Sequence, residues 1–171
     1  LRQGEALVAR AWKTPVRFPR ELHVLHTQEL ADACPGMTPR EREDWACRQW
    51  GAVLLVGIGA PLSDGIPHDR RAPDYDDYTT PGWKGLPGLN GDLLVWHGRL
   101  ERAVELSSMG VRVNRETLLR QLDEQEVSGR LGLPWHQALV KGHLPQTIGG
   151  GIGQSRTLMV LLNRAHIGEV Q

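Results

Sequence analysis

The sequence has 171 residues, the size of one ordinary domain, which is enough to bury a proper hydrophobic core. Lysine and arginine together number 20, as do aspartate and glutamate, so the formal net charge is zero. A protein that depends on contacts to phosphate backbones usually carries a basic excess, and we therefore expect no nucleic-acid partner. No apolar run approaches the roughly 20 residues that span a bilayer, and we expect no membrane contact.

The start of the chain suggests a longer parent. Residue 1 is leucine rather than methionine, and it lies inside a loose helical pattern of apolar residues over 1–13. No signal peptide is recognisable. The spacing of Cys34 and Cys47 is not that of a metal site, so we interpret both as buried thiols, with a disulfide as the unsupported alternative. We expect a piece of a longer, cytoplasmic protein.

The first elements along the chain are a short strand over 22–26 and the start of a short helix over 27–30. A longer helix should then begin at Thr38, which can cap it. Pro39 suits the first helical position, and Glu41 stands where a capping box requires it. This helix should end near residue 50. Its inner face is expected to carry Trp45, Ala46, Gln49 and Trp50.

The middle of the chain alternates between apolar strands and a long polar connection. Residues 52–56 form an unbroken apolar run, which predicts a strand buried on both faces in the middle of a sheet. Residues 60–91 are rich in Pro, Gly and Asp and show no periodicity, and connections of that length are more often functional than idle. Strands over 93–96 and 103–113 should form an antiparallel pair that turns near Gly98.

The remaining elements are mainly helical. Asn114 should cap a helix, a short helix is predicted over 134–140, and an apolar helix over 155–163. Residues 166–171 are expected to begin a last strand. The order of elements predicts an α+β fold, a mainly antiparallel sheet flanked by helices, in a single domain.

A run of glycines precedes the last helix. Gly149, Gly150, Gly151 and Gly153 lack side chains, so this backbone can approach a ligand closely. The first N–H groups of the helix that follows favour anions. Arg156 lies in the first turn, where a cation opposes the helix dipole, so its charge is easier to explain with a phosphate or carboxylate opposite. A glycine-rich turn with a solvated arginine remains an equal alternative.

The strand over 105–112 carries polar residues on both faces if it alternates strictly. One face should carry Glu105, Ser107 and Met109. The other should carry Leu106, Ser108, Gly110 and, if no bulge intervenes, Arg112.

A carboxylate at the centre of a sheet needs a partner. The neighbouring strand supplies Asp92, so Asp92 and Glu105 together make a candidate seat for Mg²⁺, which prefers a few carboxylates plus phosphate oxygens. A salt-bridged pair at a sheet edge is the alternative that composition alone favours. The acidic loop over 64–77 is either solvated surface or a site for an ammonium group or a metal. We expect no catalytic role for His68 and no metal-ligand role for His136.

The chain contains several phrases that resemble one family in order and spacing. These phrases are ELHVLHTQEL, GAVLLVGIGAPLSDG, DRRAPDYDD, GLNGDLLVW, ELSSMGVRV, WHQALVKG and QTIGGGIGQSR. Over 22–171 the chain resembles bacterial aspartate–ammonia ligases, the ammonia-dependent asparagine synthetases. The resemblance implies the catalytic fold of class II aminoacyl-tRNA synthetases and a cytoplasmic homodimer. It also implies an enzyme that uses ATP and Mg²⁺ to convert L-aspartate and ammonia to L-asparagine through a β-aspartyl adenylate, releasing AMP and pyrophosphate.

The resemblance also implies roles for individual residues. Arg156 resembles the arginine of the third class II motif, which meets ATP, and with Glu105 it is the expected catalytic pair. The expected ATP and Mg²⁺ site consists of Asp92, Glu105, Gly151, Gly153, Ser155 and Arg156, with the metal on the two acids. The expected substrate pocket consists of Tyr75, Asp76, Ser107, Ser108 and Arg112, with Asp76 holding the substrate ammonium.

The resemblance leaves out part of the family's pattern. The first two class II motifs have no counterpart before residue 1, so we expect the C-terminal portion of a catalytic domain, inactive alone. One alternative is a relative of class II aspartyl- or asparaginyl-tRNA synthetases, although Gly153-Gln154-Ser155-Arg156 lacks their usual Glu-Arg pair and no anticodon-binding module is visible. Another is a non-catalytic module that binds ATP or an amino acid.

Overall fold

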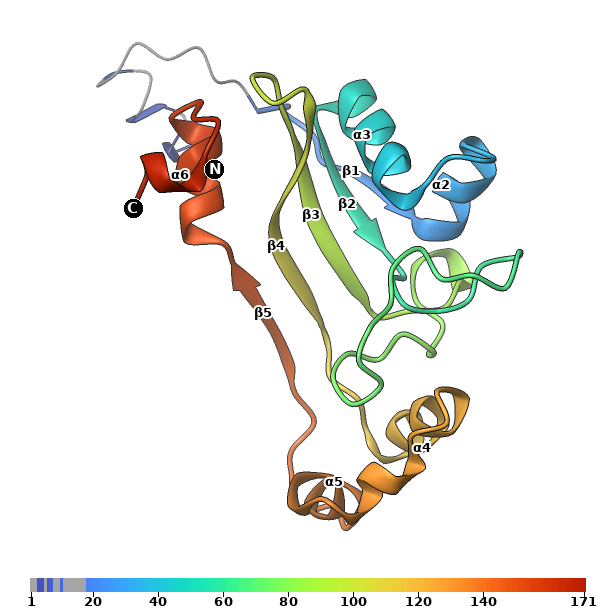
Figure 1. Ribbon diagram of the computed structural model, residues 1–171. Coiled ribbons are helices and arrows are strands. Elements are labelled where there is room, and N and C mark those ends of the chain that lie inside the picture. Colours follow the sequence, from blue (N-terminus) through green and yellow to red (C-terminus); the bar gives the residue numbers. More distant parts are fainter. Residues whose placement is uncertain (1–2, 5, 8–9, 11–17) are drawn as a thin grey trace.

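The computed structural model describes residues 3–4, 6–7, 10 and 18–171. Its described residues form a five-stranded sheet in the order β1-β2-β3-β4-β5 (Figure 1). The strands are β1 (His23–His26), β2 (Ala52–Val56), β3 (Asn90–His97), β4 (Arg102–Val111) and β5 (Ile148–Ile152). β1 and β2 run parallel, whereas the three other neighbouring pairs are antiparallel. The predicted sheet, mainly antiparallel with 52–56 away from its edges, is confirmed.

Helices cover both faces of this sheet. The α-helices are α2 (Thr27–Ala33), α3 (Pro39–Trp50), α4 (Arg115–Glu124), α5 (Pro134–Val140) and α6 (Gln154–Leu161). Short 3-10 turns are η1 (Trp83–Gly85), η2 (Ser128–Gly132) and η3 (Ile167–Glu169). Figure 1 shows α2 and α3 beside β1 and β2 on one side and α6 on the other. The helix predicted over 1–13 falls mostly outside the described residues.

The apolar run of β2 has a partner on each face. Val53 and Leu55 pack with Cys47 of α3 in one buried cluster. Ala52 packs with Met159 of α6 in a second cluster on the opposite face. Alternation along the strand therefore sends successive side chains into two cores, which explains why the run contains no polar position.

Local capping fixes where the two longest helices begin. The Thr38 hydroxyl accepts from the Glu41 N–H, and the Glu41 carboxylate accepts from the Thr38 N–H at 2.8 Å, which confirms the predicted capping box. Asn114 likewise accepts from the Thr117 N–H at 3.0 Å at the start of α4. On the inner face of α3, Cys47 is fully buried and Gln49 is exposed, so the expectation for Gln49 was wrong.

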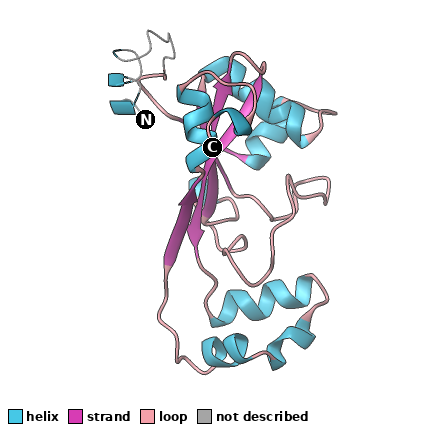
Figure 2. Ribbon diagram, turned by 60° about the vertical axis from the view of Figure 1, so that its left-hand side comes forward, coloured by secondary structure: helices cyan, strands magenta, loops and turns pink. Residues whose placement is uncertain are grey.

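The segment between β4 and β5 folds into a helical lobe with its own core. Leu118 and Leu122 of α4 are fully buried and pack with Leu139 of α5 and Val113. Figure 2 shows this lobe below the end of the sheet, joined to it by β4 and β5. The lobe therefore borders the sheet where the long connection before β3 also passes.

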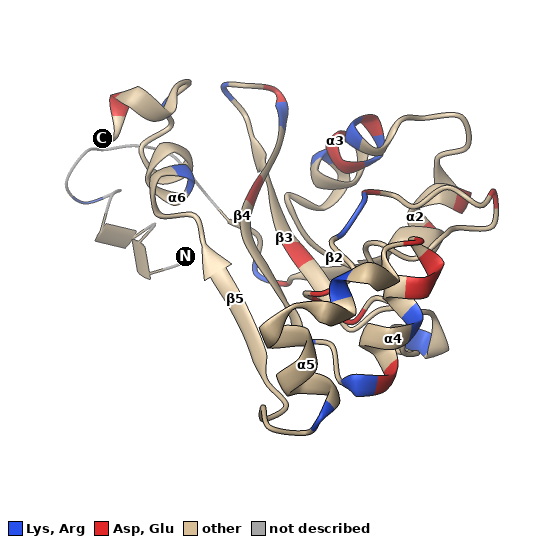
Figure 3. Ribbon diagram, turned by 60° about the horizontal axis from the view of Figure 1, so that its bottom comes forward, with Lys and Arg blue, Asp and Glu red and all other residues tan. Residues whose placement is uncertain are grey.

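Two segments differ from the sequence prediction. Residues 166–171 form no strand, because the Glu169 carboxylate accepts from the His166 N–H and His166 Nδ1 accepts from the Gly168 N–H, which closes the turn η3. The glycine run, expected either as a ligand-binding approach to the last helix or as a turn, is the strand β5. β5 pairs with β4 along 148–152 and carries no charged residue (Figure 3).

Candidate functional site

A buried ion pair lies where the long connection crosses β4. The guanidinium of Arg112 donates to the Asp76 carboxylate, whose residue is only 4% exposed. Arg112 also lies over the ring of Tyr75, with 3.9 Å from guanidinium carbon to ring centroid, and donates to the Tyr75 hydroxyl at 3.1 Å. Three of the five residues that the sequence assigned to the substrate pocket, Tyr75, Asp76 and Arg112, are therefore connected.

Backbone pairing holds this part of the connection against β4. The Asp77 N–H donates to the Val111 carbonyl at 2.9 Å, and the Val113 N–H donates to the Tyr75 carbonyl at 3.0 Å. Asp76 and Arg112 thus form an isolated antiparallel bridge. Through this short extension of the sheet, the long polar connection places Asp76 in the candidate site.

Two glycines make room for the ion pair. A Cβ on Gly110 would lie 2.7 Å from the Asp76 carboxyl carbon, and a Cβ on Gly149 would lie 2.6 Å from Arg112 Nη2. Both distances are far inside ordinary van der Waals contact. Gly110 and Gly149 pair across β4 and β5, so the Asp76–Arg112 pair lies over a sheet surface without side chains.

A β-bulge in β4 changes which side chains share this face. Asp92 pairs with Ser108, but Leu94 pairs with Glu105, so Leu106 has no partner on β3. Asp92 and Leu94 are two residues apart and share a face, and their partners Ser108 and Glu105 therefore share it too. The prediction that Glu105 and Ser107 share a face was wrong, because the unpaired Leu106 between them interrupts the strict alternation of side chains.

Ser107 lies on the opposite face, since its partner is Leu93. It is buried, and its hydroxyl donates to the Gly151 carbonyl at 2.9 Å. Arg112 lies on the face of Gly110. The sequence predicted this on the condition that no bulge intervenes, and the bulge at Leu106 precedes both residues. Ser108, rather than Ser107, therefore borders the Asp76–Arg112 pair.

The two acids proposed for a metal have different partners. Asp92 forms an ion pair with Arg71, which comes from the long connection. Glu105 is half-exposed and meets Arg156, with 3.5 Å between Oε2 and Nη1, and Arg156 also donates to the Glu105 carbonyl at 3.3 Å. The expected catalytic pair is thus in contact. Within the described residues, no group of three or more His, Cys, Asp or Glu side chains is arranged to hold a metal.

The start of α6 carries the other nucleotide-site residues. Gly153 precedes the helix, and its N–H donates to the Leu106 carbonyl at 2.8 Å. Gly151 has no neighbouring atom within 4 Å of where a Cβ would lie, so its outer side is open. Ser155 and Arg156 occupy the first turn and no acidic residue is there, which leaves the positive end of the helix dipole uncompensated by its own side chains.

Burial governs the electrostatics of Asp76. Desolvation raises the pKa of its carboxyl above the ordinary value, and the charge and hydrogen bonds of Arg112 act in the opposite direction. By contrast, burial of Asp74 is outweighed by hydrogen bonds from His136 and Arg130, each at 3.0 Å, which leave its pKa below the usual value. His136 of α5 is therefore a hydrogen-bonding partner of Asp74.

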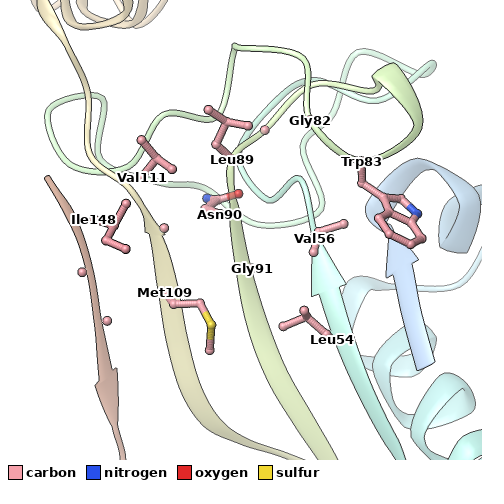
Figure 4. A pocket seen from close by; sticks show the side chains of 14 residues that line it. Leu54, Val56, Gly82, Trp83, Leu89, Asn90, Gly91, Met109, Val111 and Ile148 are labelled. Atoms are coloured by element: carbon pink, nitrogen blue, oxygen red, sulfur yellow. The ribbon is translucent and has the colours of Figure 1, made fainter. Parts of the chain in front are cut away.

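The other face of the same strands forms an apolar hollow of about 590 Å³ (Figure 4). The side chains of Leu54, Val56, Met109, Val111 and Ile148 point into it. No titratable group lines it. Its lining suits an apolar partner surface and offers no chemistry, so the candidate reaction site lies on the opposite face, with Asp76, Asp92 and Glu105.

Sequence reasoning missed two residues that organise this polar face. Arg71 was read only as part of a mixed-charge loop, although its ion pair covers Asp92. Gln121 was not singled out within the predicted helix, although it is completely buried and bonds to the backbone around Asp76. A polar residue between the buried Leu118 and Leu122 was the available signal, because such a position in a helix needs a hydrogen-bonding partner.

The two cysteines are buried and free, as predicted. Burial raises the pKa of the Cys47 thiol to about 12, so this sulfur has no nucleophilic form near neutral pH. None of the helices in the described part of the chain is long and apolar enough to cross a membrane. Neither finding adds chemistry to the polar face.

Comparison with solved structures identifies the fold. An asparaginyl-tRNA synthetase from Entamoeba histolytica superposes with a TM-score of 0.65 at 17% sequence identity, over 97% of this chain and 38% of that one. An asparaginyl-tRNA synthetase from Pyrococcus horikoshii gives 0.59 at 15% identity, over 86% and 34%. At such low identity the likeness establishes the catalytic fold of class II synthetases and nothing about substrates.

Comparison of sequences identifies the family. The aspartate–ammonia ligase family model matches residues 1–171. An aspartate–ammonia ligase of Bacteroides thetaiotaomicron is 56% identical over 154 residues, and that of Bacteroides fragilis is 54% identical over the same length. Each alignment covers 90% of this chain and 45% of the relative, so the chain spans about half the length of the curated relatives it matches. The chain belongs to the aspartate–ammonia ligase family.

Proposed function

We propose that the full-length gene product carrying this chain is an enzyme that makes L-asparagine from L-aspartate and ammonia at the expense of ATP. The observation that carries the proposal is family membership over the whole chain, at 54–56% identity to two aspartate–ammonia ligases. The polar face described above supports it, because it combines a buried carboxylate, an arginine and a glycine-lined strand. A site with these parts suits a zwitterionic amino acid beside a phosphate-bearing nucleotide.

We propose that the reaction passes through a β-aspartyl adenylate. A β-carboxylate oxygen of aspartate attacks the α-phosphorus of ATP, and the bond to the leaving pyrophosphate breaks. The nitrogen of ammonia then attacks the activated carbonyl, AMP leaves with one of the original carboxylate oxygens, and a proton is released. Negative charge grows on the α-phosphate in the first step, where arginine side chains stabilise it most effectively in the absence of bulk water.

The polar face suggests a role for each group. Asp76 would hold the substrate ammonium, sharing its carboxylate with Arg112, and Tyr75 would close the outer side of the pocket. Ser108 would hydrogen-bond the substrate from β4. Arg156 would meet the phosphates from the first turn of α6, where its exposed pair with Glu105 costs little to break.

A divalent cation fits the same face. Asp92 and Glu105 supply hard oxygen ligands, and Mg²⁺ commonly binds through one or two carboxylates and completes its shell with phosphate oxygens and water. Mg²⁺ would neutralise part of the triphosphate charge. The ion pair of Asp92 with Arg71 makes Glu105 the freer of the two ligands.

We further propose that the chain is the C-terminal portion of the catalytic domain and is inactive alone, within a cytoplasmic homodimer. The relatives are about twice as long, and the apolar hollow over β2–β5 is a surface that further chain or a second copy can cover. Mixing the isolated 171 residues with aspartate, ATP, Mg²⁺ and ammonia should yield no asparagine. Turnover by the isolated chain would contradict this part of the proposal.

An isotope experiment tests the chemistry of the full-length protein. Aspartate labelled with ¹⁸O in its β-carboxylate should yield asparagine, pyrophosphate and AMP in equal amounts, with one ¹⁸O atom in each AMP. Formation of ADP and phosphate would instead indicate a β-aspartyl phosphate. Aminoacylation of tRNA without free asparagine would favour a synthetase relative, and ATP binding without turnover would favour a non-catalytic module.

A pair of variants tests the role of Arg156. Arg156→Ala should lower kcat/KM for ATP by about 100-fold or more, the usual size of a lost transition-state charge contact. Arg120→Ala, which removes an exposed arginine from α4, is the matched control and should leave kcat/KM within about twofold. Equal activity of the two variants would exclude Arg156 from the reaction.

A further inference from the structure

Gln121 is a polar side chain in an apolar setting. It lies on α4 and is 0% exposed, and Leu118 and Leu122 on the same helix are also fully buried. A glutamine is seldom buried to this extent unless its amide is satisfied. The side chain does not belong to the lobe's apolar cluster, so its partners must explain its place.

The Gln121 amide hydrogen-bonds to three backbone groups and contacts one hydroxyl. Its Oε1 accepts from the Tyr78 N–H at 3.0 Å and from the Thr79 hydroxyl at 3.3 Å. Its Nε2 donates to the Pro73 carbonyl at 2.9 Å and to the Asp76 carbonyl at 3.1 Å. The single proton of the Thr79 hydroxyl is shared with the Asp77 carboxylate at 3.2 Å, so both donor positions of the amide and one of its two acceptor positions are filled without competition.

These contacts surround Asp76. The partners of Gln121 lie on both sides of it in the sequence, from 73 to 79, and one of them is the carbonyl of Asp76 itself. β4 holds the same segment from the other side, through the Val111 carbonyl and the Val113 N–H. The backbone that presents the Asp76 carboxylate is therefore fixed between a strand and one glutamine side chain.

Among the described residues, Gln121 is the one member of α4 whose side chain hydrogen-bonds to the 73–77 segment, although Gln125 just after the helix bonds to the Arg71 carbonyl and the Tyr78 hydroxyl. An aliphatic side chain of similar size would fill the same volume. It would leave the Pro73 and Asp76 carbonyls and the Tyr78 N–H without their hydrogen-bonding partner. Because an unsatisfied buried polar group is costly, the segment should shift toward water or toward another partner. Displacement of this segment moves Asp76 and leaves the rest of the sheet in place.

We propose that Gln121 is a positioning residue that sets the Asp76 carboxylate for the ammonium group of the amino-acid substrate. The inference rests on the proposed function, since it takes aspartate to be the ligand of Asp76. Gln121 touches no substrate in this arrangement. It acts through the backbone of the segment from 73 to 79, and its effect should appear in the handling of aspartate and not of ATP.

Steady-state kinetics of the full-length protein with Gln121→Met test this inference. The KM for aspartate should rise by about tenfold or more, because small displacements of a binding group are costly, whereas the KM for ATP should stay within about twofold. Gln121→Asn keeps an amide that can both donate and accept, one methylene shorter, so its effect on the KM for aspartate should be smaller. Gln137→Met, which removes a hydrogen bond to Leu131 within the lobe, is the matched control and should change neither KM.

The outcomes separate this inference from the function on which it rests. No asparagine from the wild-type protein would refute the function. If the wild type makes asparagine and Gln121→Met shows a lower kcat but an unchanged KM for aspartate, the positioning role is refuted. Gln121 would then have a structural role alone. Should Gln121→Met not fold, the comparison of Gln121→Asn with Gln137→Met decides. Faster hydrogen exchange at 75–79 in the Gln121 variant, and not in the control, would support the inference independently of turnover.

Discussion

Gly110→Ala is a one-methyl change at a crowded point of the polar face. The new Cβ would lie 2.7 Å from the Asp76 carboxyl carbon and 2.9 Å from the Asn90 Cβ. Asn90 cannot retreat cheaply, because its amide accepts from the Ile58 N–H at 2.9 Å and donates to the Ile58 carbonyl at 2.7 Å. Asp76 must therefore give way by roughly half an ångström, which is the kind of forced shift that overpacking produces.

The expected cost follows from two opposing effects. Overpacking of a closed site destabilises by about 1–3 kcal/mol. Loss of backbone freedom in the unfolded chain returns about 0.4–1 kcal/mol. Gly110→Ala should therefore lower the free energy of unfolding by about 1–2 kcal/mol, and the displaced Asp76 should also raise the KM for aspartate.

Urea unfolding followed by tryptophan fluorescence measures the first effect, and initial rates measure the second. Gly98→Ala is the matched control, since nothing lies within 4 Å of its added methyl group in the turn between β3 and β4. That variant should be as stable as the wild type or slightly more so. A Gly110→Ala protein with the unfolding midpoint and KM of the control would refute the reasoning from crowding.

Two further predictions concern titrating groups. Because burial raises the pKa of the Cys47 thiol to about 12, iodoacetamide at about pH 8 should label this residue only after unfolding in urea, and rapid labelling of the native protein would contradict its burial. Hydrogen bonds from His136 and Arg130 outweigh burial and hold the pKa of Asp74 below its ordinary value, so its contribution to stability is present above that value and is lost as the pH falls through the folded pKa. Asp74→Asn should therefore destabilise the protein more at about pH 7 than at about pH 3, and an equal loss at both would refute the ionic account.

Much of the fold was predictable because its signals are local. The capping box at Thr38, the cap at Asn114 and the two-sided apolar run of β2 depend on neighbours within a few residues. The resemblance supplied the class of the fold and the residues of the polar face. Tyr75, Asp76 and Arg112 do lie together, although their roles toward a substrate remain predictions.

What the sequence did not predict depends on contacts between distant segments. The face of Glu105 is set by pairing with Leu94, and no periodicity within β4 reveals that Leu106 is the extra residue. The glycine run has low intrinsic strand propensity and becomes β5 only because β4 offers a partner. The role of Gln121 likewise depends on a segment 42–48 residues away along the chain.

The unpaired residue of β4, Leu106, connects the strand to α6. Glu105 and Ser107 already lie on opposite faces of β4, because they pair with the consecutive residues Leu94 and Leu93. Deleting Leu106 would therefore join them as neighbours in a regular strand without changing the face of either. The polar face would thus keep its pattern. The protein would lose a buried side chain beneath α6 and the carbonyl that receives the Gly153 N–H. The extra residue therefore attaches α6 to the strand and sets the distance between Arg156 and β4. A homologue that lacked this residue would keep its acidic side chains in place and would misplace its arginine.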